Sequence, residues 1–332
     1  MQENKKRAGI LGTGSYLPDN ILTNAELEKM VDTSDEWITT RTGIKERRIA
    51  DKSVTTSFMA TAAAKKALED SGIAADEIDL IIVATVVPDM NFPSTACMVQ
   101  ANIGAKNAAA FDIEVGCSGF IYGLSIAQQF ICNGFYKKIL VIAADTLSKI
   151  TNWKDRNTCV LFGDGAGAAV IGEVEGAYGI LNTYIGADGE GGKHLFMPSS
   201  VSVIPPDEIT DKDNFYTIHM DGQEIFKFAV KIINTASDEI LKKCGLKPED
   251  IDMFIPHQAN IRIIEASMKR LKLSKEKVYI NLDKYGNMSA ASIIVALDEV
   301  NRNGMIKRND NILMVAFGAG LTWGSVIIKW AK

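Results

Sequence analysis

Cys117 stands in a turn whose residue types suit a nucleophile. The segment 115–119 reads Val-Gly-Cys-Ser-Gly, with a β-rich run before it and an apolar, helix-like run after it. A cysteine at such a strand-to-helix turn lies at the helix N-terminus, where the helix dipole and free backbone N–H groups favour negative charge. We therefore predict a stabilised thiolate beside a backbone oxyanion site. A small buried cysteine between glycines is the alternative interpretation.

Two residues in the second half of the chain are candidate partners for this cysteine. His257, one of three histidines, follows the apolar run 251–255 and precedes a helix-like stretch. Asn287 follows Cys117 by 170 positions and stands, after a second β-rich run, in the turn Gly-Asn-Met-Ser at 286–289. Taken alone, the histidine could be a structural residue and the asparagine a turn residue. Because a nucleophilic cysteine needs a base or an electrostatic partner, we predict that the three side chains share one site.

An internal repeat explains how turns so far apart in the sequence can meet. Residues 55–83 and 228–255 each run from a helix-like stretch through a glycine and an acidic turn into an apolar run. The two glycines, Gly72 and Gly245, are 173 positions apart and suit the left-handed residue that ends a helix. In a duplicated fold, equivalent strand ends of the two halves can converge on one site.

The remaining pattern predicts the architecture that positions these turns. Apolar runs at 139–144 and 312–317 are again a matched pair, and strands that are apolar throughout are buried on both faces. We therefore expect an α/β fold with central sheets between helices, built from two similar halves, residues 1–175 and 176–332. The polar segment 185–215 reads as an excursion from the second half that could line a pocket.

Composition narrows the function classes. The chain has 332 residues, and its 36 basic and 41 acidic side chains give a net charge of −5, which argues against a nucleic-acid-binding surface spread over the whole protein. Its five cysteines include no C-x-x-C pair, so we expect neither a disulfide framework nor a zinc ribbon. With three histidines and no metal-binding motif, we expect no metal. The sequence predicts neither a signal peptide nor a membrane span, and we expect a reducing, cytoplasmic location.

Several motifs, in this order and spacing, carry a family resemblance along essentially the whole chain. They are residues 9–18, 33–38, 41–44, 116–119, 162–168, 256–260, 286–289 and 322–325. The sequence resembles β-ketoacyl-acyl carrier protein synthase III, the initiating condensing enzyme of fatty acid synthesis in the thiolase-like superfamily. The resemblance implies a duplicated five-layer α-β-α-β-α sandwich, a homodimer and no tightly bound cofactor.

The resemblance also implies a mechanism. Cys117 would take an acyl group from acyl-CoA, and malonyl-acyl carrier protein would then lose CO₂ and attack the acyl carbonyl. His257 and Asn287 would donate hydrogen bonds to the malonyl thioester oxygen. The acyl thioester oxygen would be held by backbone N–H groups of Cys117 and of the turn Gly318, Ala319 and Gly320. The family often has a third glycine where Ala319 stands.

Binding residues are implied in the same way. The CoA adenine would lie between Trp37 and Arg41, whose i, i+4 spacing puts them on one helix face. The other implied contacts are Arg156 with the nucleotide, Gly222 and Asn260 with the pantetheine arm, Phe317 beside the nucleophile, and Phe92 with the acyl pocket of the neighbouring subunit. A basic patch of Lys227, Arg262, Lys269 and Arg270 would dock the acidic carrier protein, although such charges are more often a solvated face.

Other functions fit the sequence less well. A dinucleotide-dependent oxidoreductase is suggested by Gly12-x-Gly14 and by the glycines of 163–167, but neither motif gives G-x-G-x-x-G opening a helix. Within the superfamily, a degradative thiolase would need a cysteine beyond Cys244, and an elongating synthase would pair its cysteine with two histidines. A related acyltransferase with the same three residues and a specialised polyketide-type ketosynthase remain the alternatives. The motifs do not predict which acyl-CoA serves as the primer.

Overall fold

Two β-sheets form the framework of the molecule. The computed structural model describes residues 7–198, 208–211 and 215–332. The first sheet has the strand order β1-β7-β6-β4-β5 and consists of β1 (Arg7–Tyr16), β7 (Gly165–Val174), β6 (Lys138–Asp145), β4 (Leu80–Ala84) and β5 (Ala109–Ile113). The second sheet has the order β11-β12-β13-β8 and consists of β11 (Met253–Pro256), β12 (Asn311–Gly318), β13 (Thr322–Lys329) and β8 (Gly179–Ala187).

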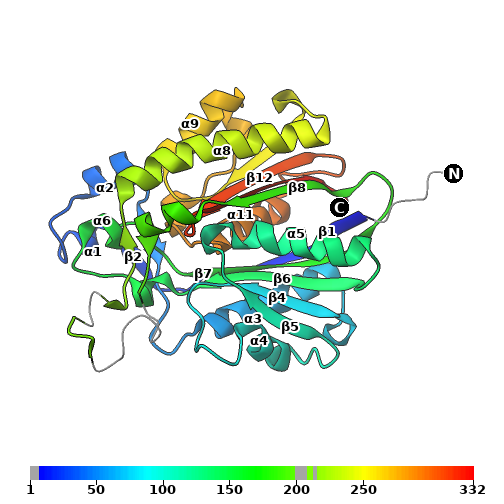
Figure 1. Ribbon diagram of the computed structural model, residues 1–332, viewed down its shortest axis with the longest axis horizontal. Helices are drawn as coiled ribbons and strands as arrows, with labels where there is room; N and C mark the ends of the chain where they lie inside the picture. The colour runs from blue at the N-terminus through cyan, green and yellow to red at the C-terminus, as the bar shows by residue number, and fades with distance from the viewer. Residues whose placement is uncertain (1–6, 199–207, 212–214) are drawn as a thin grey trace.

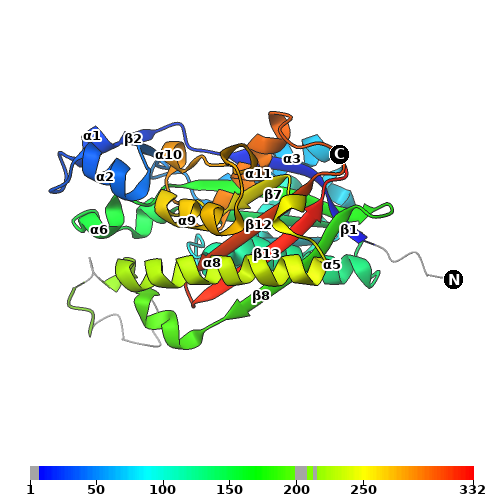
Figure 2. The same ribbon diagram turned by 90° about the horizontal axis from the view of Figure 1, so that it is seen from above.

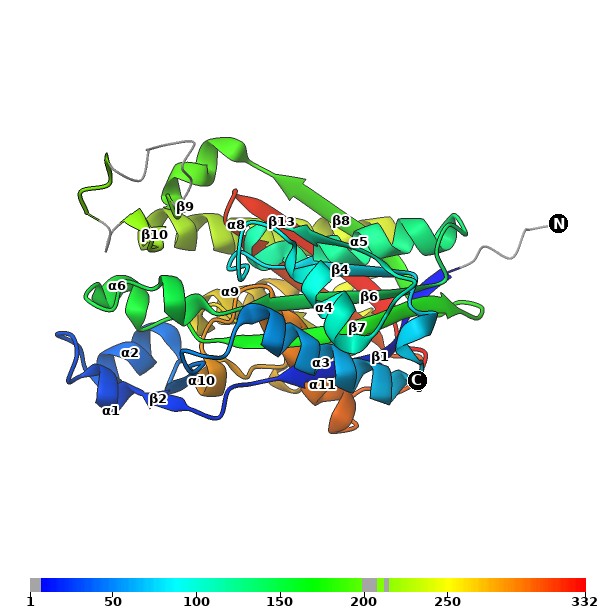
Figure 3. The same ribbon diagram turned by 90° about the horizontal axis from the view of Figure 1, so that it is seen from below.

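Helices lie on both faces of both sheets and make five layers (Figure 1). The helices α3 (Thr56–Ser71) and α4 (Thr95–Ile103) cover the outer face of the first sheet, as seen from below in Figure 3. Between the sheets lie α5 (Gly119–Cys132) and α11 (Ala291–Arg302). The helices α8 (Gly222–Cys244) and α9 (Ile261–Leu271) cover the second sheet, as seen from above in Figure 2. The predicted five-layer sandwich is confirmed.

Shorter elements surround this framework. They are α1 (Asn24–Leu27), α2 (Asp35–Thr42), α6 (Arg156–Cys159), α10 (Leu282–Tyr285), β2 (Ile21–Thr23), β3 (Glu46–Arg48), β9 (Leu195–Phe196) and β10 (His219–Met220). The polar excursion predicted at 185–215 begins inside β8, and its residues 199–207 and 212–214 lie outside the described residues. No helix among the described residues is long and apolar enough to span a membrane.

The glycines that suggested a dinucleotide motif have a packing role instead. A Cβ on Gly12 would lie 2.7 Å from the Ala67 carbonyl oxygen of α3, and one on Gly14 would lie 2.4 Å from the Ala67 nitrogen. These positions must be glycine because the helix lies directly on β1. On the other face, a Cβ on Gly167 would lie 2.4 Å from the Ile294 side chain of α11. The strand β7 therefore packs closely against α11 in the middle layer of helices.

The internal repeat is present in the structure down to single hydrogen bonds. Gly72 and Gly245 both end their helices in the left-handed conformation, with φ of 68° and 66°. Asp79, before β4, accepts the backbone N–H groups of the residues that open β6, at 2.8 and 2.9 Å. Asp252, 173 positions later, accepts the N–H of Asn311 at the start of β12, at 2.9 Å. Equivalent aspartates, Asp79 and Asp252, therefore link two neighbouring strands by hydrogen bonds in each half.

One part of the repeat is not kept. The sequence predicts a β-rich run before each site turn, and the first half has β5 there. In the second half the corresponding segment pairs only through an isolated bridge between Val278 and Phe254. The second sheet therefore has one strand fewer, and the prediction of a matching strand is wrong there. The backbone leaves the sheet and forms α10 just before Asn287.

Candidate active site

The turn that carries Cys117 is held by close backbone contacts. It is a single 3-10 turn, Gly116–Ser118, directly before α5. Gly116 has φ of 54°, and a Cβ there would lie 2.6 Å from the Ala319 nitrogen. A Cβ on Gly318 would lie 2.3 Å from the Cys117 nitrogen. The loop between β12 and β13 is thus packed on the cysteine turn, in the region where a backbone oxyanion site would be needed.

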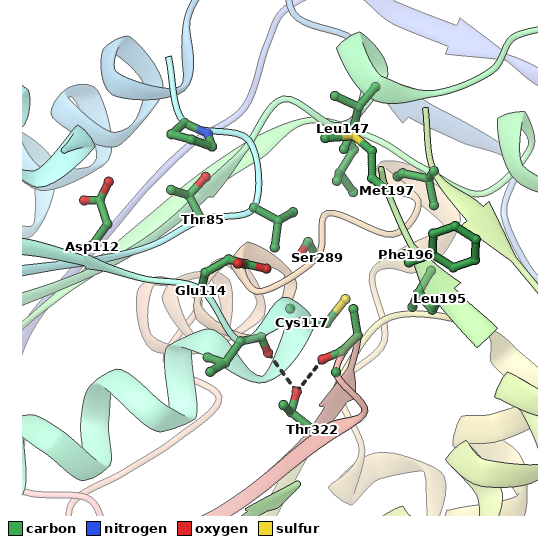
Figure 4. Close-up of a pocket in the computed structure, with 18 of the residues that line it drawn as sticks. Thr85, Asp112, Glu114, Cys117, Leu147, Leu195, Phe196, Met197, Ser289 and Thr322 are labelled. Carbon is green, nitrogen blue, oxygen red and sulfur yellow. Dashed lines mark hydrogen bonds between the residues drawn. The ribbon is translucent and has the colours of Figure 1, made fainter. Parts of the chain in front are cut away.

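A buried hydroxyl fastens these two turns together. Thr322 Oγ1 lies 2.8 Å from the Val115 carbonyl oxygen and 2.9 Å from the Ala319 carbonyl oxygen (Figure 4). The hydroxyl of Ser118 is 2.5 Å from the same Oγ1. Since these contacts join β13 to the residues on both sides of Cys117, they fix the loop relative to the thiol.

The Cys117 thiol differs from the prediction in one respect. Its position at the start of α5 is as expected, and it lines a cavity. Desolvation by the surrounding protein, however, raises the pKa of the thiol to about 12, and the nearby Asp145 carboxyl contributes to the increase. The predicted resting thiolate is therefore wrong: the thiol is protonated at neutral pH and must lose its proton when it reacts.

His257 follows β11 and is held in one orientation. Its backbone N–H donates to the Val315 carbonyl oxygen at 2.8 Å, and its Nδ1 lies 2.8 Å from the Ser292 hydroxyl. The ring packs edge-on against Phe317, with centroids 5.3 Å apart. The buried Nε2 has no partner among the described residues. Burial lowers the histidine pKa to about 3, so the ring is neutral and can donate a hydrogen bond from Nε2 when Ser292 donates to Nδ1.

Asn287 is oriented by its own turn. Its backbone carbonyl oxygen accepts the Gly163 N–H at 3.0 Å, and its N–H donates to the Leu161 carbonyl oxygen at 2.8 Å. The side-chain Oδ1 accepts the N–H of Ser289 at 2.9 Å. This hydrogen bond uses the carbonyl end of the amide and leaves the Nδ2 donor for another partner.

The neighbours of both residues reach Cys117. Phe317 packs on His257 and directly precedes Gly318, whose backbone lies against the Cys117 turn. Ser289, which orients Asn287, interacts with the Cys117 thiol. The structure therefore gathers the three predicted side chains at adjoining turns of the two sheets.

A cavity of about 810 Å³ opens at Cys117. Figure 4 shows the thiol at its floor, with Leu147, Leu195, Phe196 and Met197 on one side and Asp112 and Glu114 on the other. Part of the polar excursion thus lines the cavity, as expected. A largely apolar pocket of this size suits a small organic group such as an acyl chain.

Known proteins share both sequence and structure with this chain. Family models described as 3-oxoacyl-(acyl carrier protein) synthase III and its C-terminal part match residues 111–189 and 241–330. The β-ketoacyl-acyl carrier protein synthase III of Caldanaerobacter subterraneus subsp. tengcongensis is 70% identical over 99% of both chains, and that of Syntrophomonas wolfei is 57% identical over 97% of both. This chain belongs to the β-ketoacyl-acyl carrier protein synthase III family.

Solved structures support the same assignment for this synthase III. The crystal structure of the Aquifex aeolicus 3-oxoacyl-(acyl carrier protein) synthase III has a TM-score of 0.91 and 51% identity, covering 97% of this chain and 100% of that one. A priming β-ketosynthase from the R1128 polyketide pathway has a TM-score of 0.92 and 35% identity, covering 100% of this chain and 99% of that one. The family's members are condensing enzymes of the acyltransferase type, and so is this chain.

Four of the predicted substrate-binding residues of the synthase III lie together. The guanidinium groups of Arg41 and Arg156 lie 5.7 and 5.3 Å from the ring centroid of Trp37. Asn260, at the start of α9, donates from Nδ2 to the Arg41 carbonyl oxygen at 3.1 Å. Gly222 begins α8. The structure thus forms an aromatic and cationic cluster from α2, α6 and the α9 N-terminus.

Phe92 and the basic patch are exposed, as a role toward other chains requires. The side chain of Phe92 is 85% exposed on the loop after β4, so it does not line this chain's own pocket. Lys227, however, pairs with Glu224 at 2.8 Å, and Arg270 pairs with Asp238 at 3.1 Å. The predicted patch is therefore partly neutralised by acids of α8, and Lys269 and Arg262 carry its more available charge.

Sequence reasoning missed three residues around the nucleophile: Asp145, Ser289 and Thr322. Ser289 has φ of 50°, unusual for a residue other than glycine, and the turn motif at 286–289 could have drawn attention to it. Thr322 opens the motif at 322–325, but that motif gives no sign of contact with the cysteine turn, and Asp145 lies at the end of β6 with no distinguishing local pattern. Their proximity to Cys117 comes only from the pairing of distant strands.

Proposed function

We propose that this protein joins the acyl group of an acyl-CoA to malonyl-acyl carrier protein with loss of CO₂, using Cys117 as the covalent carrier. The observation that carries the proposal is the packing of the 318–320 backbone on the Cys117 turn at the floor of an apolar cavity. At the turns that adjoin the Cys117 turn, His257 and Asn287 each have one side-chain nitrogen that no described protein group occupies.

In the first half-reaction the Cys117 sulfur attacks the thioester carbonyl of acyl-CoA. Negative charge develops on the carbonyl oxygen, and backbone N–H groups of Cys117 and the 318–320 loop receive it, a role supported by the close packing of this loop on the cysteine turn. The tetrahedral intermediate collapses with cleavage of its bond to the CoA sulfur. The acyl group then lies in the cavity, and CoA leaves with a proton.

In the second half-reaction the malonyl group loses CO₂. The electron pair of the broken carbon–carbon bond moves into an enolate, whose charge lies on the thioester oxygen. His257 Nε2–H and Asn287 Nδ2 donate to that oxygen, because their other polar atoms are held by Ser292 and Ser289. The enolate carbon attacks the acyl carbonyl, and the Cys117 thiolate leaves.

The direct test of this function is the reaction itself. The protein is incubated with acetyl-CoA and other short acyl-CoAs, together with malonyl-acyl carrier protein, and both CO₂ and β-ketoacyl-acyl carrier protein are measured. We expect the two products in equal amounts. Transfer of the acyl group to the carrier protein without CO₂ would instead support the related acyltransferase, and a product released only with a polyketide-type primer would support the specialised ketosynthase.

The cluster around Trp37 is proposed to bind the CoA adenine. The ring is flanked by two guanidinium groups, and stacking of a base on an aromatic ring contributes ~1–3 kcal/mol. We expect Trp37→Ala to raise the KM for acyl-CoA roughly tenfold with little change in kcat. Steady-state kinetics with varied acyl-CoA measure this effect. Trp37→Phe keeps a ring and is the matched control; an unchanged KM in the alanine variant would contradict the assignment.

The basic patch on α8 and α9 is proposed to dock the acidic carrier protein. Arg262 is exposed and lies over Phe226, which holds its charge on the surface. We expect Arg262→Glu to raise the KM for malonyl-acyl carrier protein roughly tenfold at low salt and to leave Cys117 acylation by acyl-CoA unchanged. Lys106→Glu, an exposed site next to the first sheet, makes the same charge change as a control. Equal effects of the two reversals would contradict a docking role.

The remaining proposals concern the assembly and its surroundings. A homodimer is supported by Phe92, which is 85% exposed beside the cavity-lining residues Asn91 and Ser94, and by β5, which is an edge strand. The five cysteines are free, which fits a reducing cytoplasm. The chemistry above uses acyl-CoA as a substrate, and every step is assigned to side chains and backbone groups, without a tightly bound cofactor.

A further inference from the structure

A buried carboxyl group lies next to the nucleophile and has no assigned role. Asp145, at the end of β6, is 0% exposed. Its Oδ1 accepts two hydrogen bonds, from the Thr85 hydroxyl at 2.9 Å and from the Val86 N–H at 2.8 Å. Its Oδ2 is buried without a hydrogen-bond partner among the described residues. A buried carboxyl oxygen without a partner is costly, so it calls for an explanation.

Ser289 is close to both this carboxyl group and the Cys117 thiol. Its hydroxyl interacts with both groups, yet Oγ has no contact of full hydrogen-bond geometry within the described chain. Figure 4 shows Ser289 beside Cys117 at the cavity. The Ser289 N–H is held by Asn287 Oδ1 at 2.9 Å, which fixes the residue while the hydroxyl can rotate.

We propose that Asp145 accepts the Cys117 thiol proton through the Ser289 hydroxyl when the cysteine is acylated. The thiol proton moves to Ser289 Oγ as the serine proton moves to Asp145 Oδ2. The electron pair left on sulfur forms the bond to the acyl carbon. When the bond to CoA breaks, its thiolate takes up one proton, which Asp145 returns by way of Ser289 or solvent. This proposal rests on Cys117 being the nucleophile of the proposed function.

The charges in the site favour this route over a direct one. Burial raises the pKa of Asp145 to about 6, so the group is ionised at neutral pH and is a better proton acceptor than His257, whose pKa is lowered to about 3. A thiolate beside an ionised Asp145 would place two negative charges in one buried space. Transfer of the proton moves the single negative charge from oxygen to sulfur, so the site never holds two charges.

Other titratable side chains at the cavity are engaged elsewhere or lie in solvent. On β5, Asp112 accepts the backbone N–H groups of Thr95 and Ala96 at 2.6 and 2.7 Å. Glu114, which follows β5, is exposed. His257, after β11, is bonded to Ser292. Among the described titratable groups near Cys117, Asp145 is thus the buried carboxyl with an oxygen available to a proton from the thiol.

The pH dependence of Cys117 alkylation by iodoacetamide tests the relay. If the carboxylate takes the proton, the fraction of reactive thiolate stays constant between the two macroscopic pKa values of the pair, and the wild-type rate is flat from about pH 7 to 9. In Asp145→Asn the acceptor is lost, and the rate rises about tenfold per pH unit over the same range. At pH 7 acylation by acyl-CoA falls about 10²-fold, the usual contribution of a positioned base.

Two further variants test the bridging serine and serve as a control for loss of a buried carboxylate. Ser289→Ala removes the bridging oxygen and is expected to keep the flat alkylation profile, which Asp145 sets, while acylation by acyl-CoA at pH 7 slows roughly tenfold or more. Asp164→Asn removes another buried carboxylate, one that accepts hydrogen bonds from Ser148 and Ala50, and is expected to keep the flat profile even where its melting temperature falls. A flat profile in Asp145→Asn, acylation of Ser289→Ala at the wild-type rate, or a wild-type alkylation rate that already rises tenfold per pH unit would overturn the relay.

The outcome is separable from that of the proposed function. Iodoacetamide needs neither CoA nor carrier protein, so its pH profile reports the relay alone. Wild-type protein that is alkylated at Cys117 with a flat profile but is not acylated by any acyl-CoA would contradict the proposed function and support the relay as a device for forming the thiolate. Acylated wild-type protein with an unchanged profile in Asp145→Asn would contradict the relay alone.

Discussion

Replacement of Cys117 by alanine is expected to abolish acyl transfer from acyl-CoA. The acyl group has no other carrier in the cavity, since Ser118 is bonded to Val115 and Thr322. We expect condensation to fall by at least ~10³-fold, to the level of uncatalysed exchange. Radiolabelled acyl-CoA followed by gel filtration measures the label that stays on the protein, and the condensation assay measures the product.

The same helix offers a matched control for this variant. Cys132 lies at the opposite end of α5 and is exposed. Cys132→Ala is expected to retain the label and the activity of the wild type. If the label persisted in Cys117→Ala and disappeared in Cys132→Ala, the assignment of the nucleophile would be wrong.

The second large effect is expected at the decarboxylation step. His257→Ala or Asn287→Ala removes one donor to the enolate oxygen, and such a loss costs about 10²–10³ in rate. Acylation of Cys117 uses other donors and is expected to continue in both variants. Release of CO₂ from malonyl-acyl carrier protein, measured with protein that already carries the acyl group, separates the two half-reactions.

The pH dependence of decarboxylation is a second test of the role of His257. Because burial lowers the His257 pKa to about 3, the ring is neutral above that value, and the Nε2–H donor is present throughout the range from pH 5 to 9. We expect decarboxylation by the acylated protein to show no loss of rate between pH 7 and 5 from protonation of this histidine. Equal loss of acylation and decarboxylation in the alanine variants would contradict the division of roles.

Much of the site could be predicted because the fold is duplicated. The offset of 170 between Cys117 and Asn287 identified two equivalent turns, and the left-handed glycines at 72 and 245 mark the same helix end in each half. These features are local: a turn, a helix stop and an apolar run can each be recognised from a few neighbouring residues. The family motifs then assigned a chemistry to the turns.

The features that sequence reasoning missed depend on the contacts of distant strands. Asp145 interacts with Thr85 and Ser289 only because β6 pairs with β4 and the second half folds over their ends. The raised pKa of Cys117 has the same origin, since its main cause is burial by both halves. The helix dipole, which is a local effect, had predicted the opposite direction. Likewise, the pair between Arg270 and Asp238 exists only because α8 and α9 pack together. The pair between Lys227 and Glu224 is instead an i, i+3 contact within α8, which its spacing in the sequence could have indicated.

Mass spectrometry of the acylated protein shows directly whether Cys117 carries the acyl group between the two half-reactions. The protein is incubated with a short acyl-CoA, digested and analysed, then treated with malonyl-acyl carrier protein and analysed again. We expect one acyl group per chain on the peptide that contains Cys117, and its disappearance together with formation of β-ketoacyl-acyl carrier protein. An unmodified Cys117, or an acyl group that persists after malonyl-acyl carrier protein is added, would contradict it.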